Sequence, residues 1–111
     1  MKTTISQQTI RLTIVTPVYN TERYIAETIS SVVAQLQAGD QYIVVDDGST
    51  DATSEILATA DPRVEIVRQA NAGEAAAVNT AIARSRNVIV GVVNADDPIL
   101  PGLLDAVRHA F

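Results

Sequence analysis

The stretch that decides the fold is Tyr42-Ile43-Val44-Val45-Asp46-Asp47-Gly48-Ser49-Thr50-Asp51, in which an apolar run stops in two acids, a glycine and short polar residues. The length and β-branching of the run are typical of a strand covered on both faces, as in a parallel α/β sheet. In such sheets, ligands bind beyond the carboxyl ends of the strands. We therefore expect Asp46, Asp47 and Gly48 to border a binding site, although a turn and a helix cap use the same residue types.

The segment before this strand predicts another strand and a helix. Residues 12–16 alternate and are rich in β-branched side chains, Pro17 is expected to end hydrogen-bond donation by this strand, and residues 18–21 are expected to form a loop. Asn20 or Thr21 then serves as a helix cap. Apolar residues recur at steps of three and four over 24–36, which predicts an amphipathic helix packed on the sheet.

The segment after this strand alternates in the same way. A short helix is expected before Pro62, because the residue preceding a proline is pushed out of the helical region. Residues 64–68 alternate with charged side chains and predict an edge strand. An alanine-rich helix is expected over 74–85, and its inward side chains are predicted to be Ala75, Val78, Ile82 and Ala83.

The last strand and helix complete the predicted topology. Residues 88–93 form the most apolar segment and are expected to be a central strand, followed by a helix that starts near Pro101. Strands and helices therefore alternate along the whole chain. This order predicts a three-layer α/β/α fold with a mostly parallel, doubly wound, Rossmann-like sheet.

Composition narrows the class of protein. The chain has 111 residues, 47% of them hydrophobic, which predicts one domain over 1–111, with 1–9 as a disordered leader. The net charge of -5 argues against nucleic acid as a partner. Cysteine is absent and His109 is the single histidine, so no zinc site is expected. Because no apolar run is long enough to cross a bilayer, we expect a cytoplasmic protein.

Acids end two of the predicted strands. Asp46 and Asp47 follow one strand, and Asp96 and Asp97 follow another. Parallel strands would bring the four carboxylates to one edge of the sheet, where their repulsion requires a cation or hydrogen-bond donors. Carboxylates together with substrate phosphates are typical ligands of Mg²⁺ and Mn²⁺. A nucleoside diphosphate with a divalent metal therefore fits, whereas a turn followed by a helix cap remains the alternative for residues 94–98.

Several blocks of sequence, taken together, resemble one family. They are Thr16-Pro17-Val18-Tyr19-Asn20, Ser30-Ser31-Val32-Val33-Ala34-Gln35, Val44-Val45-Asp46-Asp47-Gly48-Ser49-Thr50-Asp51-Ala52-Thr53, Asn71-Ala72-Gly73-Glu74-Ala75-Ala76-Ala77-Val78-Asn79 and Asn94-Ala95-Asp96-Asp97. In this order and spacing the blocks resemble glycosyltransferase family 2, which has the GT-A fold. The resemblance runs from Leu12 to about Leu104. No dinucleotide-binding glycine motif or P-loop competes with it.

The resemblance implies a nucleobase pocket. Pro17, Tyr19 and Glu22 would border this pocket, with the ring of Tyr19 offering a face for stacking. Packing of Tyr19 on the core is the alternative. Asp47 would accept a hydrogen bond from the imide N–H of a uracil-type base, which favours a UDP-type donor, and Asp46 would support the loop.

The resemblance also implies a phosphate and metal region. Asn71, Gly73 and Asn79 would shape the wall beside the sugar and phosphates. Asp96, with help from Asp97, would hold a divalent metal, Mn²⁺ or Mg²⁺, on the diphosphate.

The chain departs from the commoner family pattern at two positions in these blocks. Asn94 replaces the first aspartate of the Asp-x-Asp motif and would accept a hydrogen bond from a ribose hydroxyl. Val78 stands where many relatives have an arginine.

By the resemblance, we expect the nucleotide-sugar-binding half of an inverting family 2 glycosyltransferase. The half that binds the acceptor and supplies the catalytic base is expected to be absent, so this fragment alone would be inactive. The acceptor, a glycan or a lipid-linked sugar, and membrane association of a parent protein are not determined by the sequence. The alternative function is a non-catalytic binding or assembly domain of the same fold. Apolar surface around Leu103, Leu104, Val107 and Phe111 is expected to be exposed and to favour a homo-oligomer.

Overall fold

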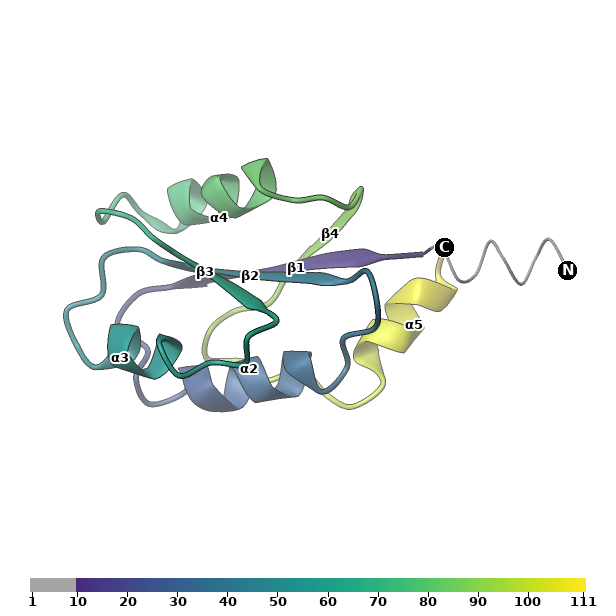
Figure 1. Ribbon diagram of the computed structural model, residues 1–111, viewed down its shortest axis with the longest axis horizontal. Helices are drawn as coiled ribbons and strands as arrows, with labels where there is room; N and C mark the ends of the chain where they lie inside the picture. The colour runs from purple at the N-terminus through teal and green to yellow at the C-terminus, as the bar shows by residue number, and fades with distance from the viewer. Residues whose placement is uncertain (1–9) are drawn as a thin grey trace, which may run out of the picture.

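The computed structural model describes residues 10–111, and its centre is a 4-stranded parallel sheet (Figure 1). The strand order is β3-β2-β1-β4. The predicted leader 1–9 lies outside the described residues. The elements, in chain order, are β1 (Leu12–Val18), α2 (Ile25–Val33), β2 (Gln41–Asp46), α3 (Thr53–Leu57), β3 (Val64–Arg68), α4 (Glu74–Ala83), β4 (Ile89–Val92) and α5 (Leu103–His109).

Helices cover both faces of the sheet, which confirms the predicted α/β/α arrangement (Figure 1). On one face, Ala77 and Ala81 of α4 pack against Val15, Ile43 and Val45. Helices α2, α3 and α5 cover the other face, where the core includes Leu12, Ile14, Val18, Ile25, Ile29, Val32, Tyr42, Val44, Leu57, Val64 and Leu104. Side chains of β1 and β2 alternate between the two cores because successive residues of a strand point to opposite faces.

Strand β1 continues through Pro17 to Val18, so the prediction that the loop begins at Val18 is wrong. The carbonyl of Val15 accepts a hydrogen bond from the N–H of Val93, and alternation directs Pro17 toward that same β4 side. Strand β4 has already ended at Val92. The missing N–H of Pro17 therefore breaks no hydrogen bond, while Val18 still accepts from Asp47 on the β2 side.

Strand β4 lies at one edge of the sheet, opposite β3, so the prediction that it is central is wrong, whereas the edge position of β3 is confirmed. Among the described residues β4 pairs only with β1. Its residues are half-buried or exposed, with Val92 52% exposed, and Val88, which precedes the strand, is 97% exposed. Apolar composition indicates that a strand favours burial, but it does not identify the strand beside it.

Helix α4 buries Ala77 and Ala81, not the predicted set Ala75, Val78, Ile82 and Ala83. Ile82 is 46% exposed. Alanines occupy several faces of this helix, so its apolar pattern does not specify which face packs on the sheet.

Helix α5 is attached to the other elements by Leu104, which is buried, and by Arg108, which pairs with the carboxylate of Asp40. Leu103 and Phe111 are 42% and 71% exposed, as expected, but Leu104 belongs to the core, contrary to the predicted surface. Within residues 10–111, no helix is both long enough and apolar enough to cross a membrane.

Candidate functional site

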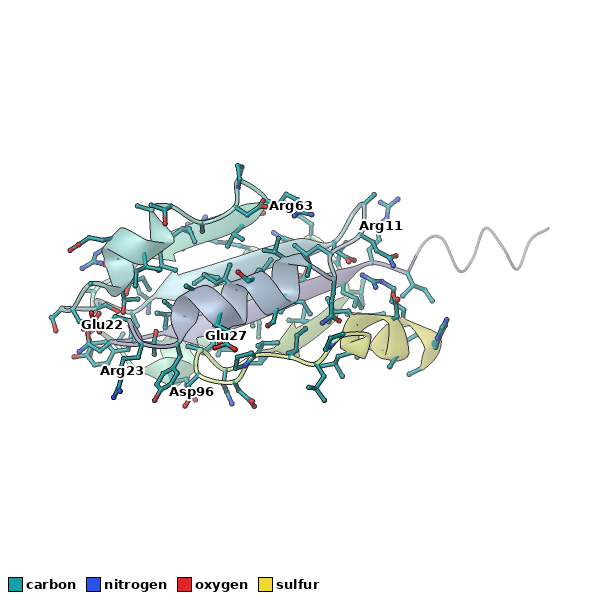
Figure 2. The ribbon with its side chains drawn as sticks, turned by 90° about the horizontal axis from the view of Figure 1, so that it is seen from below. Arg11, Glu22, Arg23, Glu27, Arg63 and Asp96 are labelled. Atoms are coloured by element: carbon teal, nitrogen blue, oxygen red, sulfur yellow. The ribbon has the colours of Figure 1, made fainter. Side chains whose placement is uncertain are left out.

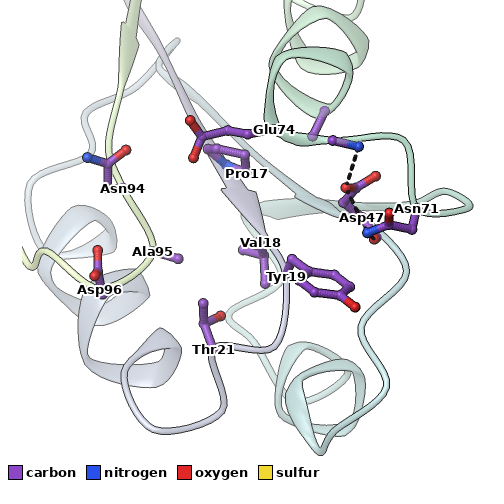
Figure 3. A pocket seen from close by; sticks show the side chains of 12 residues that line it. Pro17, Val18, Tyr19, Thr21, Asp47, Asn71, Glu74, Asn94, Ala95 and Asp96 are labelled. Carbon is purple, nitrogen blue, oxygen red and sulfur yellow. Dashed lines mark hydrogen bonds between the residues drawn. The ribbon is translucent and has the colours of Figure 1, made fainter.

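A cleft of about 500 Å³ lies at the carboxyl ends of β1, β2 and β4, between the N-terminal end of α4 and the loop that follows β4 (Figure 3). This is the position predicted from the parallel topology. Its lining residues are Pro17, Val18, Tyr19, Thr21, Asp47, Asn71, Gly73, Glu74, Ala77, Asn94, Ala95 and Asp96.

Most of the site residues predicted from sequence are brought together in this cleft. They are Pro17, Tyr19, Asp47, Asn71, Gly73, Asn94 and Asp96. Glu22, Asn79 and Asp97 are exposed and do not line it. Figure 2 places Glu22 at the N-terminal end of α2, where its N–H lies 3.4 Å from a carboxylate oxygen of Asp51.

Sequence reasoning missed Val18, Thr21, Glu74, Ala77 and Ala95 as lining residues. Each is adjacent to a predicted residue or, in the case of Ala77, one helical turn after Gly73. Adjacency to a predicted residue was therefore a usable signal, but only packing decides which neighbour faces the cleft.

The loop that bears Tyr19 is tied to the loop after β2. Asn20 has a positive φ of 51°, and its side-chain oxygen accepts hydrogen bonds from the N–H groups of Thr50, at 2.8 Å, and Asp51, at 3.3 Å. The predicted capping of α2 by Asn20 or Thr21 is therefore wrong, because no side chain caps this helix. Hydrogen bonds thus join the two loops at the edge of the cleft, where the ring of Tyr19 remains 48% exposed.

Asp46 and Asp47 are adjacent in sequence, but their side chains make contacts on opposite sides of the sheet. Asp46 contacts Ser54 of α3, whereas Asp47 contacts Ala72 and Gly73 at the beginning of α4. This division follows from the two-residue period of a strand. It separates a carboxylate under the loop from one in the wall of the cleft.

Asp46 is a buried support for the loop, as expected. One carboxylate oxygen accepts a hydrogen bond from the N–H of Ser49 at 2.9 Å, and the other accepts from Ser54 at 2.6 Å and Arg68 at 2.7 Å. Burial alone would raise the pKa of Asp46, but the hydrogen bonds from Ser54 and Ser49, with the charge of Arg68, lower it below its usual value. Asp46 therefore stays ionised and holds β2, β3 and α3 together.

Asp47 accepts hydrogen bonds from four groups around it, of which Figure 3 draws Asn71 and Gly73. The side chain of Gln69 donates at 2.9 Å, and the N–H groups of Ala72 and Gly73 donate at 2.8 and 2.9 Å. The amide of Asn71 is the most distant donor, at 3.3 Å. The hydrogen bonds from Gln69, Ala72 and Gly73 lower the pKa of Asp47. The carboxylate thus fixes the backbone that leads into α4.

Gly48 lies where the loop after β2 passes close to the backbone of Asn71, and this position requires glycine. Its φ is +79°, and a Cβ atom added there would lie 2.8 Å from the backbone nitrogen of Asn71. Only glycine adopts this conformation without strain. The loop after β2 can therefore approach the 71–73 segment closely.

The loop after β4 is anchored to α2 by its backbone. The hydroxyl of Thr28 donates to the carbonyl of Ala95 at 2.7 Å, and the N–H of Ile99 donates to the hydroxyl of Ser31 at 3.0 Å. Asp96 is exposed, and no described residue donates a hydrogen bond to its carboxylate. The acid is therefore presented on a fixed loop with its oxygens free.

The predicted meeting of acids at one edge of the sheet is confirmed for Asp47 and Asp96, which line the same cleft, but the four predicted carboxylates form no metal-binding cluster within the described residues. Within 10–111 no group of three or more acidic, histidine or cysteine side chains is placed to hold a metal ion. Asp46 and Asp47 are satisfied by hydrogen-bond donors from the chain, so their mutual repulsion needs no cation. Asp96 remains as a carboxylate in the cleft without a donor from the described residues, which fits a divalent ion whose other ligands are water and phosphate.

With this geometry in view, comparison with known proteins gives the family. The family model described as "Glycosyl transferase family 2" matches residues 13–110. The chain belongs to glycosyltransferase family 2, and its sheet and helices form the Rossmann-like part of a GT-A fold.

Two curated relatives illustrate the similarity in sequence. "Glycosyltransferase GlyA" of Streptococcus pneumoniae serotype 4 is 37% identical over 90 residues, which cover 78% of this chain and 13% of that protein. "Succinoglycan biosynthesis protein ExoU" of Rhizobium meliloti is 42% identical over 84 residues, covering 72% and 24%. The chain thus spans a minor part of the curated relatives that it matches.

Solved structures are similar in fold. S. aureus TarS 1-349 in complex with UDP-GlcNAc has a TM-score of 0.79 and 26% identity, covering 90% of this chain and 30% of that chain. Mannosyltransferase PcManGT from Pyrobaculum calidifontis, in complex with GDP-Man and Mn²⁺, has a TM-score of 0.76 and 28% identity, covering 90% and 32%.

Proposed function

We propose that this chain provides the nucleotide-sugar-binding part of an inverting glycosyltransferase, which transfers a sugar from a nucleoside diphosphate sugar to an acceptor hydroxyl. The observation that carries the proposal is the cleft itself. It has an exposed aromatic ring at one side, a free carboxylate at the other, and fixed backbone loops between them. The complexes of its structural neighbours with UDP-GlcNAc and GDP-Man support this ligand class.

Tyr19 and the 71–73 wall would bind the base. The ring of Tyr19 offers a stacking face. Asp47 already has four donors, about as many as a carboxylate accepts. A base N–H would therefore displace the amide of Asn71, whose hydrogen bond is the longest of the four. By this reasoning, the main role of Asp47 is to hold the wall in place, and its contact with a uracil-type base requires Asn71 to move.

Asp96 and Asn94 would hold the diphosphate region. No arginine, lysine or histidine lines the cleft among the described residues, so the chain offers no positive side chain to a diphosphate there. A divalent ion, Mn²⁺ or Mg²⁺, would supply the missing positive charge, with Asp96 as its carboxylate ligand and Asp97 beside it. Asn94 would accept a hydrogen bond from a ribose hydroxyl. When bound, the ion would neutralise the charge that develops on the leaving diphosphate.

The experiment is a calorimetric titration of the chain with UDP, GDP, UDP-GlcNAc and GDP-mannose, each with and without Mn²⁺. We expect the chain to bind the ligands of one base, uracil or guanine, and to bind them only when Mn²⁺ is present. Asp96→Ala should abolish the dependence on Mn²⁺, whereas Glu55→Ala, a change of an exposed acid in α3 outside the cleft, should not. Absence of binding by the wild-type chain in both series would refute the proposed function and favour an assembly role for the fold.

A further inference from the structure

Glu74 is a free acid in the wall of the cleft. It is the first residue of α4, it lines the cleft, and it is exposed. No described residue donates a hydrogen bond to its carboxylate. In Figure 3 its side chain extends over Pro17, with the carboxyl group on the Asn94 side and directed away from Asp47. Glu74 therefore faces the space that a ligand would occupy, with both oxygens available.

The backbone holds Glu74 in this position. The N–H of the preceding residue, Gly73, donates to Asp47 at 2.9 Å, and the carbonyl of Gly73 accepts from the N–H of Ala77 at 3.1 Å. Gly73 has a φ of +100°, which favours glycine. A carboxylate in the first turn of a helix is also stabilised by the helix dipole. The start of α4, and with it the Cα atom of Glu74, is thus fixed by the same contacts that fix the cleft wall.

The charges around Glu74 limit what it can bind. A diphosphate placed directly against a free carboxylate would be repelled, and no cationic side chain of the described residues lines the cleft to offset the repulsion. Hydroxyl groups are suitable partners, because an ionised carboxylate only accepts hydrogen bonds and its two oxygens can accept from two neighbouring hydroxyls. A nucleoside diphosphate sugar carries such hydroxyls on its ribose and on its sugar.

We propose that Glu74 is a specificity-determining residue that accepts hydrogen bonds from a hydroxyl pair of the bound nucleotide sugar, on either the ribose or the transferred sugar. This inference rests on the proposed function. It adds a carboxylate contact to a hydroxyl-bearing part of the ligand, which is either the ribose, between the base and the diphosphate, or the sugar on the far side of the diphosphate.

The test compares three ligands in the presence of Mn²⁺: UDP-GlcNAc, UDP and 2′,3′-dideoxy-UDP, with the corresponding guanine series in parallel. Glu74→Ala removes both acceptor oxygens, and Glu74→Gln keeps one of them without the charge. Glu55→Gln is the matched control, because Glu55 is also exposed in the first turn of a helix but lies outside the cleft. Urea unfolding of each variant without ligand shows whether it is folded.

We expect Glu74→Ala to weaken binding of the hydroxyl-bearing ligand about tenfold or more, since a hydrogen bond to a charged group is worth roughly 1.5–3 kcal/mol. Glu74→Gln should have a smaller effect, and dideoxy-UDP should bind to all variants equally. A loss seen with UDP and UDP-GlcNAc assigns the ribose, and a loss seen with UDP-GlcNAc alone assigns the sugar.

Equal effects on all three ligands, or none, would overturn the role of Glu74 while leaving the proposed function intact. A wild-type chain that binds no ligand of either base series would instead overturn the proposed function, and this inference with it.

Discussion

Replacing Tyr42 by phenylalanine tests how the buried strands beneath the cleft are stabilised. Tyr42 is 0% exposed, and its hydroxyl shares a hydrogen bond of 2.8 Å with the hydroxyl of Thr16 on β1, which is also 0% exposed. Burial raises the pKa of Tyr42 to about 12, although the hydrogen bond with Thr16 acts to lower it. Tyr42→Phe keeps the ring in the core and removes only the hydroxyl.

Two magnitudes follow from this geometry. At neutral pH, Tyr42→Phe should lower the free energy of unfolding by about 1–3 kcal/mol, because Thr16 is left buried without its partner. At alkaline pH the wild-type chain should lose stability, since the unfolded tyrosine ionises near its ordinary pKa of 10 while the folded one stays protonated. The stability that the protonated Tyr42 gives the folded chain is complete below pH 10 and is lost as the pH rises toward 12. By pH 11 the loss is about 1.4 kcal/mol.

The assay is urea unfolding of the wild type, Tyr42→Phe, Thr16→Val and the double variant at pH 8 and pH 11. The stability difference between wild type and Tyr42→Phe should shrink by about 1.4 kcal/mol at the higher pH, because phenylalanine does not titrate. Thr16→Val and the double variant measure the coupling between the two hydroxyls. A stability difference that is the same at both pH values would refute the reasoning, because it would mean that Tyr42 ionises as easily in the folded chain as in the unfolded one.

Three further substitutions test the loops and helix α5. Gly48→Ala should destabilise the chain by about 1–3 kcal/mol in urea and weaken nucleotide binding, because φ is +79° and the new Cβ meets the backbone of Asn71; unchanged unfolding would contradict this strain. Arg108→Met should cost roughly 3–5 kcal/mol, because it leaves the buried carboxylate of Asp40 without its cation, and limited proteolysis should then release α5; adding Asp40→Asn should restore part of the loss. Asp46→Asn should flatten the acid side of the stability curve. Because the folded chain lowers the pKa of Asp46 from 3.8, its ionised carboxylate stabilises the fold above pH 3.8, and this stability is lost as the pH falls further. Equal acid unfolding of the wild type and Asp46→Asn would contradict this expectation.

The order of strands and helices could be predicted from the sequence because its signals are local. An apolar β-branched run such as 42–45 forms a buried strand, and the acids and glycine that follow it form a loop, whatever lies elsewhere in the chain. Parallel topology then places such loops on one edge of the sheet. The resemblance to the family supplied most of the individual cleft residues that the structure brings together.

Contacts between distant segments could not be predicted in this way. The three alanines of residues 75–77 are compatible with several packed faces, so only the sheet selects Ala77 for the core and leaves Glu74 in the cleft. The apolar pattern of β4 is the same at an edge or at the centre of a sheet, and the strand order alone places it at the edge.

The sequence by itself determined that two aspartates follow a buried strand, because strand length, turn chemistry and the two-residue period are properties of neighbouring residues. Only the tertiary structure decided what each aspartate does. Asp46 meets Arg68 and α3 on one side of the sheet, and Asp47 meets the start of α4 on the other. Arg68 and Gly73 lie far along the chain from the aspartates, and folding is what brings them within hydrogen-bond distance. The two aspartates are therefore held by the chain itself, and the cleft carboxylates without a donor from the described residues are those of Glu74 and Asp96.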